Sequence, residues 1–279
     1  MNLRVMTHSD VPAGMRLKDL SGWNQTAEDW QRFLQSNPEG CFVAESDGSV
    51  CGTAATIIYE NRLAWIGMVL VDPKNCGRGI GTQLLKRAIE HLDARHIPTI
   101  KLDATPQAKA IYERLGFATE FEIERWALQR PPGAADAELR SAEPNFERIA
   151  KLDRNIFGAD RGSLLASLNQ GAPEFTLAVQ RENDLAAYSL GRRGSRADHL
   201  GPWMARDESS AREILEKFLR RSGRDTVFVD CLKSNPFAGD LLRSHHFKFA
   251  RPLTRMVRGS NANPGRPELL CAILGPEFG

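Results

Sequence analysis

The chain has 279 residues with a formal net charge of +2 at pH 7, and 42% of its residues are hydrophobic and 26% charged. This composition is typical of a soluble globular protein, and the length predicts about two domains. The near-neutral charge gives little support for a nucleic-acid partner, and no apolar run approaches the roughly 18 residues of a membrane span, so we expect no membrane contact.

The first part of the chain predicts helices followed by strands. Residues 10–37 are mostly helical, with Trp30, Phe33 and Leu34 at helical spacing. The next stretch, CFVAESDGSVCGTAATIIY, has two apolar runs around Asp47 and Gly48. An Asp-Gly pair supplies the positive dihedral angles of a tight turn, so this stretch predicts a hairpin. Residues 64–71 predict a third strand.

A loop with glycines at alternate positions follows this strand and precedes a helical pattern. The loop sequence is CGRGIG, with Gly77, Gly79 and Gly81. N–H groups at a helix N-terminus lack internal partners and carry the positive end of the helix dipole, and glycine lets that backbone approach an anion. The spacing matches neither the G-x-G-x-x-G dinucleotide fingerprint nor the G-x-x-x-x-G-K-[ST] phosphate loop. The loop predicts an anion site, and a tightly packed strand-to-helix turn is the alternative.

The helix after the loop runs to about residue 95, and three further elements complete the first half. These are a strand at 99–102, a helix at 106–115 and a strand pair at 118–128. The sequence RPPGAAD at residues 130–136 breaks both helix and strand patterns and is therefore the best linker. It predicts two domains, residues 1–130 and residues 137–279.

The second half repeats the order of the first. Residues 175–192 match the hairpin, 199–219 match the strand, turn and helix, and 225–247 match 99–117. From Asp103 to Phe117 is 14 positions and from Asp230 to Phe247 is 17, so the second copy carries a three-residue insertion. A repeat this long predicts two similarly folded domains. The second copy has no glycine in ARDESSAREI, which corresponds to the loop, and it has Leu242 where the first has Tyr112.

These residues carry a family resemblance. The pattern V-D-P-x-x-C-G-R-G-I-G-T-x-L-L, followed by A-x-x-x-Y-E-R-L-G-F, resembles the signature of the GNAT acetyltransferase superfamily. The segments SGWNQTAEDW and LDATP and the closing GPEFG further resemble its tandem-domain, YitH-like branch. The resemblance implies an α/β fold with a mixed (α+β) sheet and two tandem GNAT-like domains. The first would be catalytic and bind acetyl-CoA, and the second would be degenerate, with a structural or acceptor-shaping role.

The resemblance also implies how acetyl-CoA is held. Pantetheine would lie along the backbone of Val69, Leu70 and Val71 like an added strand. The pyrophosphate would bind the amides of the loop and the first helical turn, where the residues are Gly77, Arg78, Gly79, Ile80, Gly81 and Thr82. The family usually has Arg or Gln where this chain has Cys76, but backbone amides provide most of the grip. Thr105 stands where an asparagine is frequent, and we assign it to cofactor binding with Tyr112.

Proton transfer needs an acid for the departing thiolate and a base for the amine. Tyr112 occupies the family position of the acid. No carboxylate lies in the strand at residues 66–71, so we assign the base to Asp103, with helix capping near Thr105 as the alternative. Glu60 is a weaker candidate. A backbone N–H near Val69 would stabilise the oxyanion.

The acceptor side is predicted at residues 22–25. This polar and aromatic segment contains Trp23 and Asn24 and precedes a helix, as the substrate-covering loop of the family does. We assign Trp23, Asn24 and Glu60 to acceptor binding. Trp23 packed onto the core is the alternative.

The cysteines and histidines indicate neither disulfides nor a metal site. Five cysteines form no C-x-x-C pair, and six histidines show no H-x-H or H-E-x-x-H spacing. Residues 1–4 do not begin a signal peptide, so we expect reduced thiols in a cytoplasmic protein.

The leading hypothesis is an acetyl-CoA-dependent N-acetyltransferase that moves an acetyl group to a primary amine by direct attack in a ternary complex. The acceptor is a small molecule or a protein lysine, and the protein is a monomer or a homodimer. The alternative is a catalytically inactive acyl-CoA-binding sensor or regulatory protein. The apolar segment 267–279 either docks between the domains or pairs with another chain.

Overall fold

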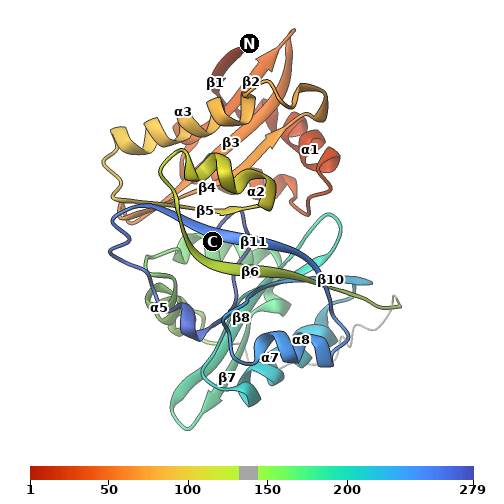
Figure 1. The fold of residues 1–279 in the computed structure, drawn as a ribbon. Coiled ribbons are helices and arrows are strands. Elements are labelled where there is room, and N and C mark those ends of the chain that lie inside the picture. Colours follow the sequence, from red (N-terminus) through yellow and green to blue (C-terminus); the bar gives the residue numbers. More distant parts are fainter. Residues whose placement is uncertain (132–143) are drawn as a thin grey trace. The chain divides into compact units, whose positions relative to one another are not determined.

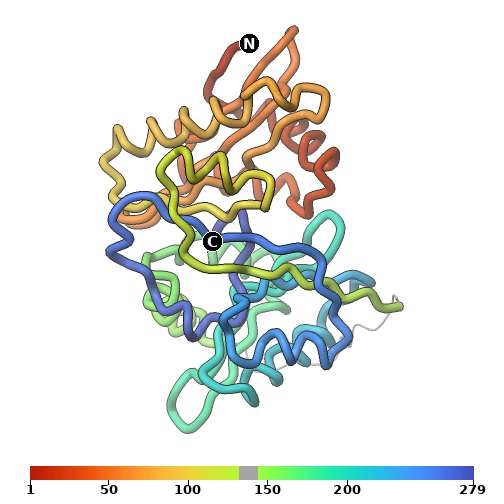
Figure 2. Tube along the Cα trace, in the orientation of Figure 1, coloured from red at the N-terminus to blue at the C-terminus, as the bar shows by residue number. Residues whose placement is uncertain are grey.

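The computed structural model describes residues 1–131 and 144–279 and divides into two compact units. Unit 1 consists of Met1–Thr119, Met256–Ala262 and Glu277–Gly279, and unit 2 consists of Glu120–Arg255 and Asn263–Pro276. Most of the predicted linker lies outside the described residues. Each unit is built from separated segments, which the sequence division into 1–130 and 137–279 did not anticipate. The colours of Figure 2 run along the sequence, so the separated segments of unit 1 are its red-to-yellow part and two short blue stretches near the end of the chain.

Unit 1 is a mixed sheet with helices (Figure 1). Its sheet contains β1 to β5 in sequence order, followed by the end of β11. The pairings from β1 to β4 are antiparallel, and β4 and β5 are parallel. The strands are β1 (Asn2–Val5), β2 (Cys41–Ser46), β3 (Ser49–Tyr59), β4 (Leu63–Val71), β5 (Thr99–Ala104) and β11 (Lys248–Gly259). The helices are α1 (Val11–Leu20), α2 (Ala27–Ser36), α3 (Ile80–Ala94) and α4 (Pro106–Glu113), with short 3-10 turns η1 (His8–Asp10), η2 (Pro38–Gly40) and η3 (Pro73–Asn75).

Glycines show which helix covers which face of this sheet. A Cβ built on Gly52 in β3 would lie 2.9 Å from a methyl of Leu84 in α3. A Cβ built on Gly67 in β4 would instead lie 3.1 Å from the ring of Phe33 in α2. Side chains alternate between the faces of a sheet, so α3 covers one face and α2 the other. The helices, the hairpin and the strands predicted for residues 10–115 are confirmed within one to a few residues.

One element of the first half differs from the prediction. Residues 118–128 were expected to form a strand pair, but they form one strand, β6 (Ala118–Gln129). This strand lies mainly in unit 2, where it pairs antiparallel with β10 (Thr226–Leu232) of the second repeat. Alternating apolar residues indicate a strand but do not identify its partner, and the two repeats carry closely similar strands.

Unit 2 contains the second repeat and most of β6, a strand from the first half of the sequence. Its strand order is β11, β6, β10, β12, β9, β8 and β7, with an additional parallel pairing of β10 and β9. The further strands are β7 (Leu177–Arg181), β8 (Asp184–Arg193), β9 (Asp198–Ala205) and β12 (Leu270–Ala272). The helices are α5 (Phe146–Phe157), α6 (Gly162–Gly171), α7 (Glu208–Arg221) and α8 (Ala238–Ser244), with 3-10 turns η4 (Pro173–Phe175) and η5 (Pro267–Leu269). The predicted repeat of hairpin, strand and helix is confirmed.

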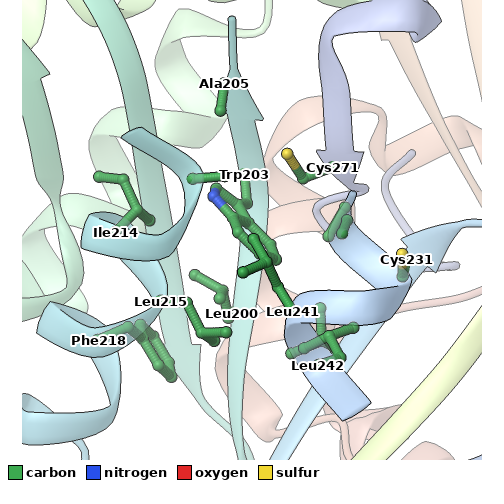
Figure 3. Packing of buried hydrophobic residues seen from close by; sticks show 14 of the residues in the cluster. Leu200, Trp203, Ala205, Ile214, Leu215, Phe218, Cys231, Leu241, Leu242 and Cys271 are labelled. Atoms are coloured by element: carbon green, nitrogen blue, oxygen red, sulfur yellow. The ribbon is translucent and has the colours of Figure 1, made fainter. Parts of the chain in front are cut away.

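The core of unit 2 explains why the second repeat keeps its hydrophobic pattern. Figure 3 shows Trp203 of β9 among Ile214 and Phe218 of α7 and Leu241 and Leu242 of α8. All five side chains are at most 1% exposed. Burying side chains of this size stabilises a fold by about 1.5–3 kcal/mol each. The second repeat therefore retains a complete core.

The segment Glu277–Gly279 belongs to unit 1 although it is distant in sequence. The ring of Phe278 stacks on Phe33, with 4.8 Å between the ring centroids. The hydroxyl of Tyr59 donates a hydrogen bond to the Phe278 carbonyl at 2.9 Å. The backbone of Glu277 lies against Gly67, because a Cβ there would approach the Glu277 carbonyl oxygen to 2.5 Å. The absence of a side chain at Gly67 thus provides the space that the backbone of residues 277–279 occupies.

We expect Gly67→Ala to lower the free energy of unfolding by about 1–3 kcal/mol, the usual cost of overpacking a dense interior. The new methyl would meet the backbone of Glu277 and the ring of Phe33, and neither is the free end of a flexible side chain. Urea unfolding measures the change.

The matched control is Gly239→Ala in α8, where the nearest atom to a new Cβ is 3.9 Å away. This change should leave the free energy of unfolding unchanged or raise it by up to about 1 kcal/mol, because alanine is the better helix former. Equal effects of the two substitutions would contradict close packing of residues 277–279 on β4.

Candidate functional site

The glycine loop adopts the backbone conformations that its sequence predicts. After β4 ends at Val71, the carboxylate of Asp72 accepts a hydrogen bond from the Lys74 amide at 3.0 Å and caps the short turn η3. Gly77 and Gly79 then have φ of +79° and +76°, the left-handed region in which other residues are strained. Nothing lies within 4 Å of a Cβ built on either residue. The loop is therefore exposed and open in front of its backbone.

The N-terminus of α3 has no side-chain cap. Gly79 holds the N-cap position, and the first intrahelical bond runs from the Gln83 amide to the Gly79 carbonyl at 3.0 Å. The amides before Gln83 have no acceptor within the helix. They lie beside an exposed loop at the positive end of a helix of 15 residues. This arrangement can bind an anion such as a phosphate.

Strand β4 is bent just before the loop. Met68 has φ of +55°, and the pairing of β3 with β4 shifts register opposite it, between Thr53 and Ala55. The Thr53 hydroxyl donates to the Met68 carbonyl at 2.8 Å. A residue with a long side chain in this conformation is strained, and such strain and bulges concentrate at functional sites. No pattern in the amino-acid sequence predicted this bulge.

Strand β5 pairs with only the first part of β4, before the bulge at Met68. Cα pairing of β4 with β5 comprises Ala64 with Ile100 and Trp65 with Lys101, near the start of both strands. Beyond these pairs the two strands diverge. The edge of β4 that contains Val69, Leu70 and Val71 is thus not paired with β5, and it leads directly into the glycine loop. An extended ligand can add to such an edge through backbone hydrogen bonds.

Tyr112 lies inside unit 1 on α4. It is 9% exposed and belongs to the same hydrophobic cluster as Ile80, the first residue of α3, and Leu102 of β5. Its ring centroid is 6.3 Å from that of Phe117. Burial raises the pKa of Tyr112 to about 12. Its phenol is therefore protonated at neutral pH, which is the state that a proton donor needs.

Asp103 and Thr105 lie on the segment that joins β5 to α4. Asp103 is half-buried in β5, two positions after Lys101 and on the same face of the strand. Thr105 is the N-cap residue of α4 with Pro106 at the first helical position, and its side chain makes no capping hydrogen bond. Both residues follow the part of β5 that pairs with β4, so they lie toward the end of β5 that has diverged.

The residues predicted for the acceptor side fall into two groups. Asn24 is 1% exposed, and Trp23 is half-buried with its amide donating to the Lys18 carbonyl at 2.9 Å. Both precede α2, which covers the face of the sheet opposite α3. Glu60 is exposed in the turn before β4, where it forms a 3.6 Å ion pair with Arg62. That turn lies at the opposite end of β4 from the glycine loop, so the structure does not bring Glu60 together with the loop.

The second repeat has a capped helix where the first has an uncapped one. Asp207 is the N-cap residue of α7, and its carboxylate accepts a hydrogen bond from the Ser210 amide at 2.8 Å. In α3 the corresponding end has no such cap. A negative charge at this position repels a phosphate. Leu242, the counterpart of Tyr112, is fully buried in the hydrophobic core.

Asp230, the counterpart of Asp103, is part of a buried ion pair. Arg125 donates two hydrogen bonds to its carboxylate, both at 2.7 Å, and His199 Nε2 lies 3.2 Å from Asp230 Oδ2. Burial by itself raises the pKa of Asp230, but the charge and hydrogen bonds of Arg125 outweigh it and hold the pKa well below its usual range. Because Arg125 lies on β6 and Asp230 on β10, this ion pair links the two strands within unit 2. The Asp230 carboxylate is therefore engaged in a structural contact.

Within residues 1–131 and 144–279 no group of three or more His, Cys, Asp or Glu side chains is placed to hold a metal ion. In the same ranges no helix is long and apolar enough to cross a membrane. The buried cysteines Cys41, Cys51, Cys231 and Cys271 are free thiols, as is the exposed Cys76.

A mixed sheet with an open strand edge, a glycine loop and an uncapped helix N-terminus is an arrangement that can bind a phosphorylated carrier, and the second repeat shares the sheet and helices without the loop. The model of the acetyltransferase (GNAT) family matches residues 14–117, and that of an acetyltransferase (GNAT) domain matches residues 149–272. The chain belongs to the GNAT acetyltransferase family and is an acyltransferase. The resemblance seen in the sequence is confirmed.

Several curated proteins are similar to most of this chain or to one part of it. The holothin acyltransferase of Pseudoalteromonas sp. (strain SANK 73390) is 24% identical over 92% of this chain and 87% of its own length. The N-acetyltransferase YitH of Bacillus subtilis, itself uncharacterised, is 25% identical over 76% of each chain. The mycothiol acetyltransferase of Streptomyces coelicolor is 32% identical over 43% of this chain and 38% of its own length.

Solved structures show the same fold over the whole length. A candidate acetyltransferase from Pyrococcus horikoshii has a TM-score of 0.80 at 23% identity, covering 100% of this chain and 95% of its own. A GCN5-related N-acetyltransferase from Sphaerobacter thermophilus has a TM-score of 0.67 at 19% identity, covering 95% and 96%. These likenesses concern the fold.

Proposed function

We propose that this protein is an acetyl-CoA-dependent N-acetyltransferase whose active site lies in unit 1. The observation that carries the proposal is the continuity of three features: the bulge at Met68, the free edge of β4 and the uncapped start of α3. Together they form a path along which an extended thioester and its diphosphate can bind. Transfer by direct attack in a ternary complex fits a site whose donor and acceptor approach from different sides.

The donor would be held by backbone groups. Pantetheine would add to the edge of β4 at Val69, Leu70 and Val71, and an amide near the bulge would stabilise the oxyanion. The pyrophosphate would bind the amides from Gly77 to Thr82, with Arg78 adding positive charge and Thr105 lying near the donor. Because backbone amides would make most of the contacts with the pyrophosphate, Cys76 in place of a longer polar side chain is compatible with binding.

The proton transfers would involve Tyr112 and a carboxylate. Tyr112 would protonate the departing coenzyme A thiolate, since its phenol is neutral at the pH of the reaction. Asp103 is a candidate base at the diverged end of β5. Trp23 and Asn24 would contact the acceptor, and Glu60, at the far end of β4, is the weaker assignment. The names of the relatives, which mention holothin and mycothiol, support a shared acyl transfer and not one shared acceptor.

The second repeat would have a structural or acceptor-shaping role. Its helix N-terminus is occupied by the carboxylate of Asp207, and it lacks the tyrosine. We therefore place one donor site in the chain, in the repeat that sequence analysis assigns to residues 1–130.

The test combines calorimetry with an assay of thiol release. Titration of acetyl-CoA should show one site per chain, and thiol release should increase on addition of a suitable primary amine. Binding without release for every amine tried would favour the alternative, an acyl-CoA sensor. No heat on titration into folded protein would contradict the donor site itself.

A further inference from the structure

A buried carboxylate lies against the strand that we assign to the donor. Glu277 is 1% exposed, and Gln25 Nε2 donates a hydrogen bond to Glu277 Oε2 at 2.8 Å. Charged side chains are almost never buried to this extent without partners or a function. Gln25 directly follows Trp23 and Asn24, the residues predicted for acceptor binding. A residue from the end of the sequence thus contacts the predicted acceptor segment.

Glu277 stands where a side chain of β4 would otherwise be. A Cβ at Gly67 would lie 2.5 Å from the Glu277 carbonyl oxygen and 3.0 Å from its Cα. Gly67 immediately precedes the bulged residue Met68 and faces away from α3. The sequence of β4, LAWIGMVLV, contains no acidic residue. The backbone of Glu277 therefore lies beside the bulge of β4, a strand without a carboxylate of its own, and the Glu277 carboxylate contacts Gln25.

The neighbouring amide oxygen indicates that a hydrogen-bond donor is needed here. Gln25 is 3% exposed, and its Oε1 is buried without a hydrogen-bond partner among residues 1–131 and 144–279. The carboxylate fixes the orientation of the amide, because the reverse orientation would place two oxygens together. A buried acceptor without a donor costs about 1–3 kcal/mol, so such an atom calls for an explanation. A ligand with N–H groups would satisfy it.

We propose that Glu277 and Gln25 bind the acceptor amine, which deepens the proposed function and rests on it. The ligand class is a primary amine, whose N–H groups donate to the Glu277 carboxylate and to Gln25 Oε1. As the amine nitrogen attacks the acetyl carbon, the C–N bond forms and the C–S bond breaks. The proton released by nitrogen passes to the Glu277 carboxylate, and the thiolate takes the phenolic proton of Tyr112. Exchange with solvent then restores both groups.

The experiment measures amine binding and turnover separately. The probes are spermidine, glucosamine and tyramine, each compared with a neutral alcohol of matched skeleton, in the presence of coenzyme A. The wild type should bind at least one amine in preference to its alcohol. Glu277→Gln should reduce that preference and kcat/KM for the amine at least tenfold, with the Kd for acetyl-CoA unchanged within twofold. The control is Glu268→Gln, an exposed carboxylate paired with Arg266, which should change neither quantity.

Two further variants keep the test decisive. Gln25→Leu leaves Glu277 in place and should also weaken amine binding, which covers the case that Glu277→Gln does not fold. Asp103→Asn tests the other candidate base, and a loss of turnover there with none in Glu277→Gln would overturn the assignment of the proton to Glu277.

Each remaining outcome has one meaning. An unchanged amine preference in Glu277→Gln, or an equal loss of acetyl-CoA affinity, would overturn the proposal in favour of a structural role. A wild type that binds coenzyme A but no amine would overturn the amine site and leave the donor site intact. A wild type that binds no coenzyme A would show instead that the proposed function has failed.

Discussion

Replacing Gly79 by aspartate should weaken acetyl-CoA binding at least 100-fold while lowering the free energy of unfolding by only about 1–2 kcal/mol. The two effects separate because the same position serves both the helix and the donor. Gly79 is the N-cap residue of α3 and has left-handed backbone, which aspartate adopts at a cost of about 1–2 kcal/mol, less readily than glycine but more readily than most residues. Its carboxylate would interact with the amides that we assign to the pyrophosphate.

The magnitude follows from charge repulsion. Two like charges 4 Å apart repel by about 4 kcal/mol at the effective dielectric constant of a protein surface. A factor of ten in affinity corresponds to about 1.4 kcal/mol, so a loss of 100-fold requires less than this repulsion. In the second repeat a carboxylate already occupies the start of the corresponding helix, where Asp207, in extended backbone, accepts a hydrogen bond from the Ser210 amide.

The measurements are calorimetric Kd values for acetyl-CoA and urea unfolding. The matched control is Gly48→Asp in the turn between β2 and β3. Gly48 has φ of +73° and nothing within 4 Å of a built Cβ, so the backbone conformation and the added charge are the same. Its acetyl-CoA affinity should stay within about threefold of wild type. Equal affinity losses in the two variants would exclude the start of α3 as the diphosphate site.

Local features of the fold could be predicted from the sequence, whereas long-range pairings could not. The hairpin at Asp47 and Gly48, the glycine loop and the helices follow from patterns within a few residues. The pairing of β6 with β10 joins residues about 100 positions apart, and the alternating pattern of β6 suits either repeat equally well. The ion pair of Arg125 with Asp230 helps to select the partner, and neither residue signals this locally.

The candidate site divides in the same way. Gly77, Gly79 and Tyr112 stand in a motif whose spacing could be read directly. The left-handed Met68 carried no signal, because methionine rarely adopts this conformation and only the shift in β3 pairing reveals it. Glu277 was not anticipated as a site residue, since it reaches β4 from 210 positions further along the chain. Gly67 was the one local sign, a residue without a side chain in an otherwise bulky strand.

The second large effect concerns the hydroxyl of Tyr112. Tyr112→Phe should lower kcat by about 100- to 1000-fold, the range expected for loss of a general acid, with the Kd for acetyl-CoA unchanged within twofold. The hydroxyl has no hydrogen-bond partner among the residues that the structure describes, so its removal should cost less than about 1 kcal/mol of stability. If Tyr112 served only in packing, Tyr112→Phe would leave kcat unchanged, because phenylalanine fills nearly the same volume.

Tyr188→Phe is the matched control and should show the opposite pattern. The Tyr188 hydroxyl donates to Asp153 Oδ1 at 2.7 Å in the core of unit 2, and its loss should cost about 1.5–3 kcal/mol of stability without affecting kcat. The pH dependence gives an independent check. Because burial raises the pKa of Tyr112 to about 12, the phenol should remain an effective proton donor from pH 7 to 10, and kcat should not fall through its ionisation in that range. A wild-type rate in Tyr112→Phe would mean that the thiolate leaves without this acid, and the mechanism would then depend on the backbone donors of β4 alone.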